Sequence, residues 1–451
     1  MLFRKISKYI EAHFQSNNDK ILIIEGARQI GKSFIIREVG KKLFPNFIEI
    51  NFVEDDEGSR IFKNVRTTED FYLALSIVGG ANLGNQEDTL IFIDEIQHYP
   101  QFLTLLKFLR QEQRFRYIAS GSLLGITLRT TTSIPIGSIV RKEMTQLDFE
   151  EFLIANNFGE HAISTIKEKL QKKESLEESL HNKLMDLFRR YLLVGGMPDA
   201  VNEYLATRNI VKVREIQDAI RSLYATDASK YEQDNNKNLL IRRIYEMVPS
   251  QMENKKKRIV AKEIRGEKGD RFSRYQDEFE YLVSSGISIE ARAISNPHYP
   301  LVESVQKNLL KLYLNDVGLL TAQLYRNNLQ PILNDEKSIN LGAVYENIVA
   351  QELKAHGHKI FYYDNRQKGE VDFLIDDYSE LSALPIEVKS GKDYTIHSAL
   401  NNLLSTKDYN IKSGLVLSNA REIQQVNNIT YMPIYYVMFL DANATSGEVY
   451  F

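Results

Sequence analysis

The stretch from Ile21 to Ser33, ILIIEGARQIGKS, has the residue types and spacing of a phosphate-binding loop. Gly26 is followed by four residues and then by Gly31, Lys32 and Ser33, which is the pattern G-x-x-x-x-G-K-[ST]. Its glycines let the backbone wrap a polyphosphate with the N–H groups turned inward, and a helix N-terminus adds positive potential. Lys32 is expected to act catalytically at the outer phosphates, and the Ser33 hydroxyl to ligate Mg²⁺. The residues expected to contact the nucleotide are Gly26, Ala27, Arg28, Gln29, Ile30, Gly31, Lys32, Ser33 and Phe34.

The segments on either side of this loop supply its structural context. Four apolar residues, Ile21 to Ile24, are typical of a buried parallel strand. The segment FIIREVGKKL after Ser33 has the apolar spacing of a helix. An ordinary glycine turn before a helix is the alternative. The order of strand, loop and helix favours the nucleotide loop, so we expect the chain to bind a nucleoside triphosphate.

A second candidate for chemistry is the segment TLIFIDE, which runs from Thr89 to Glu95. Asp94, at the carboxyl end of an apolar strand, can hold Mg²⁺ through water, and Glu95 can orient and polarise the attacking water. A strand that ends in two solvated acids is the alternative. It is disfavoured because a phosphate loop precedes the pair at a suitable interval, 94 − 32 = 62 residues after Lys32.

A further strand, RYIAS, ends at Ser120 and is followed by Gly121 and Ser122. In P-loop ATPases whose Asp-Glu strand is separated from the phosphate loop by another strand, a polar residue at this tip lies beside the γ-phosphate. Ser120 or Ser122 can fill that catalytic role, and a plain Ser-Gly-Ser turn is an equal alternative. Together with the strand candidates 47–52 and 138–145, the alternation of strands and helices predicts a parallel sheet covered on both faces, with ligand at the carboxyl ends.

Composition sets the limits of the interpretation. A chain of 451 residues is expected to form about three domains at about 150 residues each. The net charge of −3 gives no global basic field, so nucleic-acid contact requires a local patch. The absence of cysteine excludes disulfides and thiolate metal sites. The N-terminal stretch is interrupted by charge and no apolar run reaches the length of a membrane span, so we expect a cytoplasmic protein with no membrane partner.

Four segments carry a family resemblance: GARQIGKS, IFIDEIQHYP, YIASGSLLG and QLDFEEFL. They resemble the bacterial and archaeal AAA-type ATPases that carry a C-terminal domain of unknown function. The resemblance implies an AAA-type P-loop ATPase domain over residues 1–155, with ATP and Mg²⁺ as cofactors and a homo-oligomer or a protein partner. Many members place Gly-Arg before the fifth strand, where this chain has Ile136-Gly137-Ser138. Arg129 and Arg141 remain as candidates for the charge-stabilising arginine.

The middle of the chain divides into two expected parts. Residues 156–240 are predicted to form a helical lid or linker, with a hinge at Gly195-Gly196-Met197-Pro198. Residues 241–330 have a winged helix-turn-helix pattern, which the resemblance also covers. The densest basic cluster of the chain lies here and comprises Lys255, Lys256, Lys257, Arg258, Lys268, Arg271 and Arg274. It predicts phosphate contacts to DNA, with a protein contact or a solvated face as the alternatives. The segment 311–320 resembles a family motif to which we assign no chemistry.

The last part, residues 331–451, has the order α-β-β-β-α-β and resembles the PD-(D/E)xK, or restriction-endonuclease-like, α/β fold. Asp372, Glu387 and Lys389 form the pattern D-x14-E-x-K, since 387 − 372 = 15 leaves 14 residues between. Side chains alternate in a strand, so Glu387 and Lys389 share a face, and Asp372 can join Glu387 around a second Mg²⁺ or Mn²⁺. Lys389 is the expected catalytic residue, and Glu346 on the preceding helix the expected further ligand.

Two hypotheses for function follow. In the first, the chain is an ATPase whose nucleotide state controls a DNA-directed C-terminal half with a metal-dependent nuclease site. In the alternative, it is an ATP-gated signalling or protein-interaction switch, and its nuclease-like domain is catalytically inactive.

Overall fold

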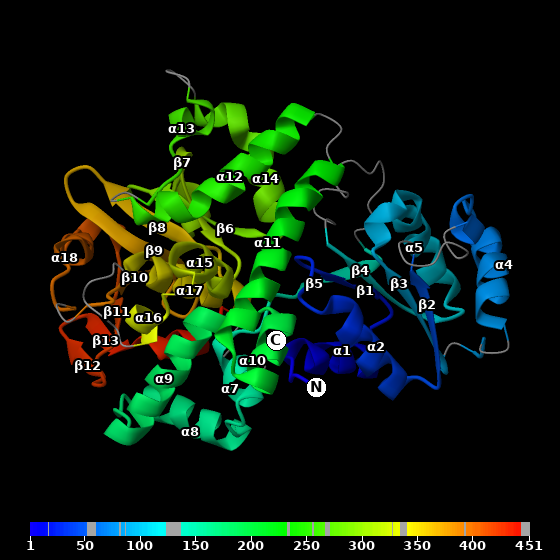
Figure 1. Cartoon of the computed structure of the whole chain (residues 1–451), viewed down its shortest axis with the longest axis horizontal. Coiled ribbons are helices and arrows are strands. Elements are labelled where there is room, and N and C mark those ends of the chain that lie inside the picture. The colour runs from blue at the N-terminus through cyan, green and yellow to red at the C-terminus, as the bar shows by residue number, and fades with distance from the viewer. Residues whose placement is uncertain are drawn as a thin grey trace. The chain divides into compact units, whose positions relative to one another are not determined.

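The computed structural model describes the whole chain except residues 17, 52–59, 81–82, 86, 123–136, 232–234, 255–256, 267–270, 327, 334–340, 392–393 and 443–451. The chain forms two compact units (Figure 1). Unit 1 comprises Met1, Phe3–Thr145 and Ser284–Gly286, and unit 2 comprises Leu2, Gln146–Val283 and Ile287–Phe451.

Unit 1 is built on a five-stranded sheet in the order β2-β3-β4-β1-β5, and every neighbouring pair is parallel. Its strands are β1 (Ile21–Glu25), β2 (Asn46–Asn51), β3 (Thr89–Asp94), β4 (Arg116–Gly121) and β5 (Ile139–Glu143). Strand β4 lies between β1 and β3, so the phosphate loop and the Asp-Glu strand are separated by one strand, as the sequence predicts. The parallel sheet is therefore confirmed.

Helices cover both faces of this sheet. The helices of unit 1 are α1 (Lys5–Gln15), α2 (Lys32–Leu43), α4 (Thr68–Gly79) and α5 (Pro100–Glu112), with the 3-10 helix η2 (Ile96–His98). Successive residues of a strand point to opposite faces. Ile91 packs in one cluster with Phe71 of α4 and Phe102 of α5. On the other face, Gly40 of α2 lies against Leu90.

Unit 2 is built on an eight-stranded mixed sheet in the order β12-β13-β11-β10-β9-β8-β6-β7. Its strands are β6 (Ser288–Ile294), β7 (Val305–Leu314), β8 (Phe361–Asn365), β9 (Gly369–Asp377), β10 (Ser382–Val388), β11 (Gly414–Ser418), β12 (Gln424–Val426) and β13 (Ile429–Pro433). Strands β8, β9 and β10 are antiparallel to one another, and β11 is parallel to β10. One face packs on α18, whose Leu400 joins Leu374 and Val416 in a buried cluster.

The helices of unit 2 fall on either side of β6 and β7 in the chain. Those before are α7 (Phe149–Ala155), α8 (Glu160–Gln171), α9 (Glu178–Val194), α10 (Pro198–Thr207), α11 (Ile210–Tyr231), α12 (Asn235–Glu253), α13 (Ala261–Arg265) and α14 (Gln276–Ser284), with η3 (Phe272–Tyr275). Those after include α15 (Val317–Tyr325), α16 (Gln330–Leu333), α17 (Gly342–Ala355) and α18 (Ser398–Leu404), and the short 3-10 helices are η4 (Leu301–Ser304), η5 (Lys407–Tyr409) and η6 (Ile434–Phe439).

The order α12-α13-α14-β6-β7 has the helices and the antiparallel strand pair of the expected winged helix. Strand β6 also pairs with β8, so these strands belong to the eight-stranded sheet, which contains strands from both sides of residue 330. A separate winged-helix domain is not confirmed, and neither is the nuclease-like fold, although α17-β8-β9-β10-α18-β11 follow in the expected order. Across the described ranges, no helix combines the length and apolarity that a bilayer crossing needs.

The hinge at Gly195-Gly196-Met197-Pro198 and the segment 311–320 meet at Asp316. Its carboxylate caps α15 by accepting from the N–H of Leu319 at 3.0 Å, and it also accepts from the N–H of Gly196 at 2.6 Å. A Cβ at Gly195 would lie 2.1 Å from Asp316 Oδ1, so the first glycine of the hinge is required by close packing. Burial raises the pKa of Asp316 to about 6, and these N–H donors oppose that rise. The role of both motifs is therefore structural.

Candidate active site

The phosphate loop of unit 1 links β1 to α2. Gly26 has φ of 147° and a Cβ there would lie 2.2 Å from the carbonyl oxygen of Met144, so only glycine fits without displacement of the backbone. Gly31 has φ of 87°, and α2 begins at the next residue, Lys32. The loop therefore ends at a helix N-terminus, where unpaired N–H groups favour an anion.

The loop side chains differ in their surroundings. Lys32 is 5% exposed, and its ammonium donates to the carbonyl oxygens of Gly26 at 3.0 Å and Ala27 at 2.7 Å. Burial lowers the Lys32 pKa, against the opposing charges of Glu95 and Asp94. Ile30 is buried, Gln29 has a left-handed backbone (φ 64°), and Phe34 is 53% exposed. The lysine ammonium is thus held inside the curve of the loop by carbonyl oxygens that a phosphate can replace.

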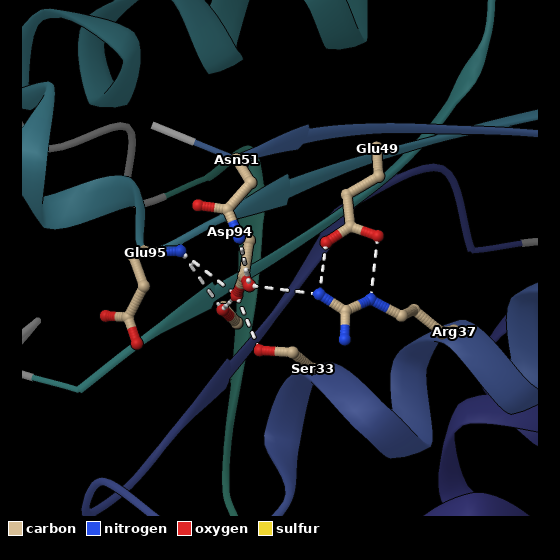
Figure 2. A network of polar contacts seen from close by, with 7 residues as sticks. Ser33, Arg37, Glu49, Asn51, Asp94 and Glu95 are labelled. Carbon is tan, nitrogen blue, oxygen red and sulfur yellow. Dashed lines mark hydrogen bonds and ion pairs between the residues drawn. The ribbon is translucent and has the colours of Figure 1, made fainter. Parts of the chain in front are cut away.

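Ser33 and Asp94 are brought together, as Figure 2 shows. The Ser33 hydroxyl donates to Asp94 Oδ1 at 2.9 Å. Asn51, at the end of β2, donates to Asp94 Oδ2 at 3.4 Å, and Ser120 donates to Oδ1. Burial raises the pKa of Asp94, and the hydrogen bonds from Ser120 and Ser33 oppose the rise. The end of the loop and the Asp-Glu strand therefore form one site.

An arginine that the sequence analysis missed lies beside this carboxylate. Arg37, one turn along α2 from Ser33, donates to both oxygens of Glu49, at 2.7 and 2.6 Å (Figure 2). Its Nη2 also lies 4.0 Å from Asp94 Oδ2. Glu49 is on β2, the edge strand next to β3. This fork geometry fixes the guanidinium next to Asp94.

Glu95 has a left-handed backbone, with φ of 52°, which is uncommon for a residue other than glycine. Its Oε2 accepts hydrogen bonds from Gln97 Nε2 and from Ser122 Oγ, the latter at 3.1 Å. Arg28 Nε in turn donates to Ser122 Oγ at 3.5 Å. Burial alone raises the Glu95 pKa, but Lys32, Gln97, Arg28 and Ser122 together lower it below its ordinary value. Glu95 is thus held as an anion.

The two serine candidates have different partners. Ser120 Oγ donates to Asp94 and accepts from the N–H of Glu95 at 3.2 Å, so it braces the acid pair. Ser122 contacts Glu95 and Gln97. For the arginine candidates, Arg141 Nε donates to Glu25 at 3.1 Å, and Arg129 is outside the described residues.

The Ser33–Asp94 pair fits a magnesium ion that is bound with nucleotide. Mg²⁺ prefers hard oxygen ligands and in nucleotide sites takes only one or two from protein, with the rest from phosphates and water. A hydroxyl and a carboxylate oxygen within hydrogen-bond distance, at the end of a phosphate loop, supply that set. The ion supplies charge neutralisation on the phosphates.

The carboxylates expected to bind a second metal lie near one another in unit 2, but each already has a partner within the chain. Glu346 on α17 accepts from Lys257, Glu387 pairs with Lys389 at 2.8 Å, and Asp372 Oδ2 accepts from the N–H of Val388 at 2.8 Å. Within the described ranges, no three His, Cys, Asp or Glu side chains are placed to hold a metal ion. In this arrangement the residues do not fit the expected second Mg²⁺ or Mn²⁺.

The expected basic patch is also different in the structure. Lys257 pairs with Glu346, and Arg258 pairs with Asp364 at 2.8 Å, so two of its cations are neutralised within unit 2. Lys255, Lys256 and Lys268 are outside the described residues. A run of cations in sequence does not reveal that distant carboxylates will neutralise it.

Comparisons with known proteins agree with the site of unit 1. Residues 18–153 match the family model of the AAA domain. Residues 185–330 and 341–437 match two models described as domains of unknown function, DUF8612 and DUF4143. A search of curated proteins finds no match.

Similar solved structures include the Walker-type ATPase of Pyrococcus abyssi, with 13% identity, a TM-score of 0.43, and coverage of 74% of this chain and 96% of that one. They also include PCH-2 of C. elegans (10% identity, TM-score 0.29, coverage 46% and 65%). The Hsp104–ADP complex of S. cerevisiae is a third (12% identity, TM-score 0.30, coverage 79% and 43%). This chain spans less than two thirds of the last two.

The parallel sheet and the phosphate loop define a P-loop fold for the N-terminal region. The same region, residues 18–153, is similar to the AAA domain.

Proposed function

We propose that the chain binds ATP with Mg²⁺ at the phosphate loop and hydrolyses it to ADP and phosphate. The single observation that carries this proposal is the 2.9 Å hydrogen bond between Ser33 and Asp94, because it joins the loop to the acid pair. The N–H groups of the loop and Lys32 bind the phosphates, while Ser33 and Asp94 hold Mg²⁺. Catalysis here is mostly positioning and electrostatic stabilisation.

In the hydrolysis step, the oxygen of a water molecule attacks the γ-phosphorus, and the bond from phosphorus to the β,γ-bridging oxygen breaks. The carboxylate of Glu95 accepts the proton that the water loses, and ADP leaves. Glu95 suits this role because hydrogen bonds from Gln97 and Ser122 hold its carboxylate in place at the end of the Asp-Glu strand. The Lys32 ammonium moves from the carbonyl oxygens of Gly26 and Ala27 to the outer phosphates, and the phosphate oxygens then accept its hydrogen bonds.

The test measures ATP binding and phosphate release with three variants. Lys32→Ala is expected to lose both. Glu95→Gln is expected to keep ATP binding and to lose about 10²- to 10⁴-fold in kcat, the range for removal of a general base. Lys41→Ala, an exposed lysine on the same helix, is the matched control and should leave both unchanged. Unchanged hydrolysis in Glu95→Gln would remove this residue from the mechanism.

We also propose that nucleotide state controls unit 2 and that this half is directed to DNA. The support is the sequence resemblance and the nearness of Glu346, Asp372 and Glu387, whose charges affect one another. A nuclease site predicts strand cleavage with Mg²⁺ or Mn²⁺ that is lost in Asp372→Ala and kept in Glu95→Gln. DNA-stimulated phosphate release that is lost in Lys32→Ala would tie DNA to the ATPase cycle.

The alternative is an ATP-gated signalling or protein-interaction switch with an inactive nuclease-like domain. The observation that favours it is the pairing of the C-terminal carboxylates with lysines. Under this proposal, ATP binding alters the affinity of the chain for a protein partner or for a second copy of itself, and no DNA is cut with either metal.

A further inference from the structure

Three carboxylates lie near one another in unit 2. Glu346 lies on α17, Asp372 on β9 and Glu387 on β10. Phe373 and Ile386 are a cross-strand pair of the antiparallel strands β9 and β10. Asp372 is the residue before Phe373 and Glu387 is the residue after Ile386, so the two carboxylates are the next neighbours across the strands. Glu346 and Glu387 are 2% and 7% exposed.

The charges of these groups influence one another strongly. Burial, together with the Asp372 charge, raises the pKa of Glu346 to about 7 and that of Glu387 to about 8. Glu387 Oε2 is buried and has no hydrogen-bond partner among the residues that the structure describes. A buried carboxylate oxygen without a donor is costly, and a cation is the group that satisfies it.

Lysines surround the three carboxylates. Lys257 donates to Glu346 Oε1. Lys311 Nζ lies 2.6 Å from Glu370 Oε1 and 3.9 Å from Glu346 Oε2. Lys389 pairs with Glu387. The positive charge that a divalent cation would supply to Glu346 is therefore already supplied by the chain.

The lysines on Glu346 differ in how firmly they are held. The Lys311 side chain is 0% exposed, lies on β7 inside the sheet and has Tyr362 beneath its ammonium at 4.6 Å. The Lys257 side chain is 20% exposed and comes from the short connection between α12 and α13. Its backbone is left-handed, with φ of 45°, which a non-glycine residue rarely adopts. Lys257 is thus the lysine that can leave without disruption of the sheet.

Lys257 conflicts directly with a metal ion. An ammonium on Glu346 occupies a carboxylate oxygen that the metal needs, and its charge repels a divalent cation at short range.

We propose that Lys257 is an internal counter-ion that excludes a hard divalent cation from Glu346, Asp372 and Glu387, so that these residues do not hold the Mg²⁺ or Mn²⁺ that the sequence pattern predicts. This inference rests on the proposed C-terminal metal site. It reconciles the D-x14-E-x-K pattern with the pairing of Glu346 and Glu387 with lysines.

The test is Mn²⁺ binding to the full chain without nucleotide, followed by the electron paramagnetic resonance signal of free Mn²⁺. Lys257→Met keeps most of the length of the side chain and removes its charge. We expect it to bind one more Mn²⁺ per chain than wild type, at least tenfold more tightly than any matching wild-type site. The added site should disappear in the double variant Lys257→Met/Asp372→Asn. Arg258→Met, which removes the neighbouring ion pair with Asp364, is the control and should bind as wild type does.

Two results would overturn the proposal, and they differ in meaning. In the first, wild type already binds Mn²⁺ with the affinity of the Lys257→Met variant, at a site that Asp372→Asn removes. The metal site is then supported, and its exclusion by Lys257 is refuted. If neither protein has a site that depends on Asp372, both fail. Circular dichroism establishes that the variants are folded, and Lys257→Gln replaces the Met variant if that one is not. None of these readouts depends on ATP hydrolysis.

Discussion

Replacement of Gln97 by alanine tests how the structure prepares Glu95. Glu95 Oε2 accepts hydrogen bonds from Gln97 and Ser122, so the variant leaves one of the two. A hydrogen bond to a charged group contributes about 1.5–3 kcal/mol, and about 1.4 kcal/mol corresponds to one pKa unit. Loss of the Gln97 bond is therefore expected to raise the pKa of Glu95 by about one to two.

The assay is phosphate release from ATP as a function of pH. The base works only when deprotonated, so activity falls as pH falls through its pKa, and a raised pKa moves this limb of kcat/KM upward. The acidic limb of Gln97→Ala should therefore lie at higher pH than the limb of wild type, whose Glu95 pKa is lowered. The looser carboxylate should also reduce kcat by about 10- to 100-fold at neutral pH.

The matched control is Gln111→Ala, which removes an exposed glutamine of α5 and should leave the pH profile unchanged. If Gln97→Ala has the wild-type profile and rate, the two hydrogen bonds do not position the base, and the reasoning for Glu95 is refuted. A Gln97→Glu variant adds a like charge beside Glu95 and should move the limb further up in pH.

Three further predictions concern the fold and the metal. Asp316 has a folded-state pKa of about 6 against an ordinary 3.8, so the folded state keeps a proton that the unfolded state releases, and stability should fall by about 3 kcal/mol as pH rises through that window. Asp316→Asn should lack this dependence in urea unfolding between about pH 4 and 7. Gly26→Ala, whose Cβ meets the Met144 carbonyl oxygen at 2.2 Å, should weaken binding of a fluorescent ATP analogue about tenfold or more, with the fold retained by circular dichroism. Ser33→Ala should raise the Mg²⁺ concentration for half-maximal phosphate release about tenfold, since one oxygen ligand is lost.

Much of unit 1 follows from local sequence patterns. The unbroken apolar runs before Gly26 and Asp94 predict buried parallel strands, and the structure confirms the parallel sheet with one strand between them. The order of the strands also predicts that Ser33 and Asp94 lie near each other. The loop to Ser33 follows β1 and Asp94 ends β3, and the carboxyl ends of parallel strands meet at one edge of the sheet. The assignment of catalytic roles to Lys32 and Glu95 stays a prediction.

Other parts of the site have no local signal. Gln97 is a single polar residue after an acid pair, and its sequence context does not indicate a hydrogen bond to Glu95. Arg37 is an ordinary helix position until β2 places Glu49 opposite it. Such roles depend on which distant segment lies alongside.

By itself the sequence determined the phosphate loop, because the spacing of Gly26, Gly31, Lys32 and Ser33 encodes a turn that wraps an anion wherever the fold places it. Only the tertiary structure decided which charged group pairs with the carboxylate of Glu346, since its partner Lys257 is 89 residues away along the chain. The physical reason is that backbone conformation is set by neighbours in sequence, whereas the charge that a buried carboxylate meets is set by neighbours in space.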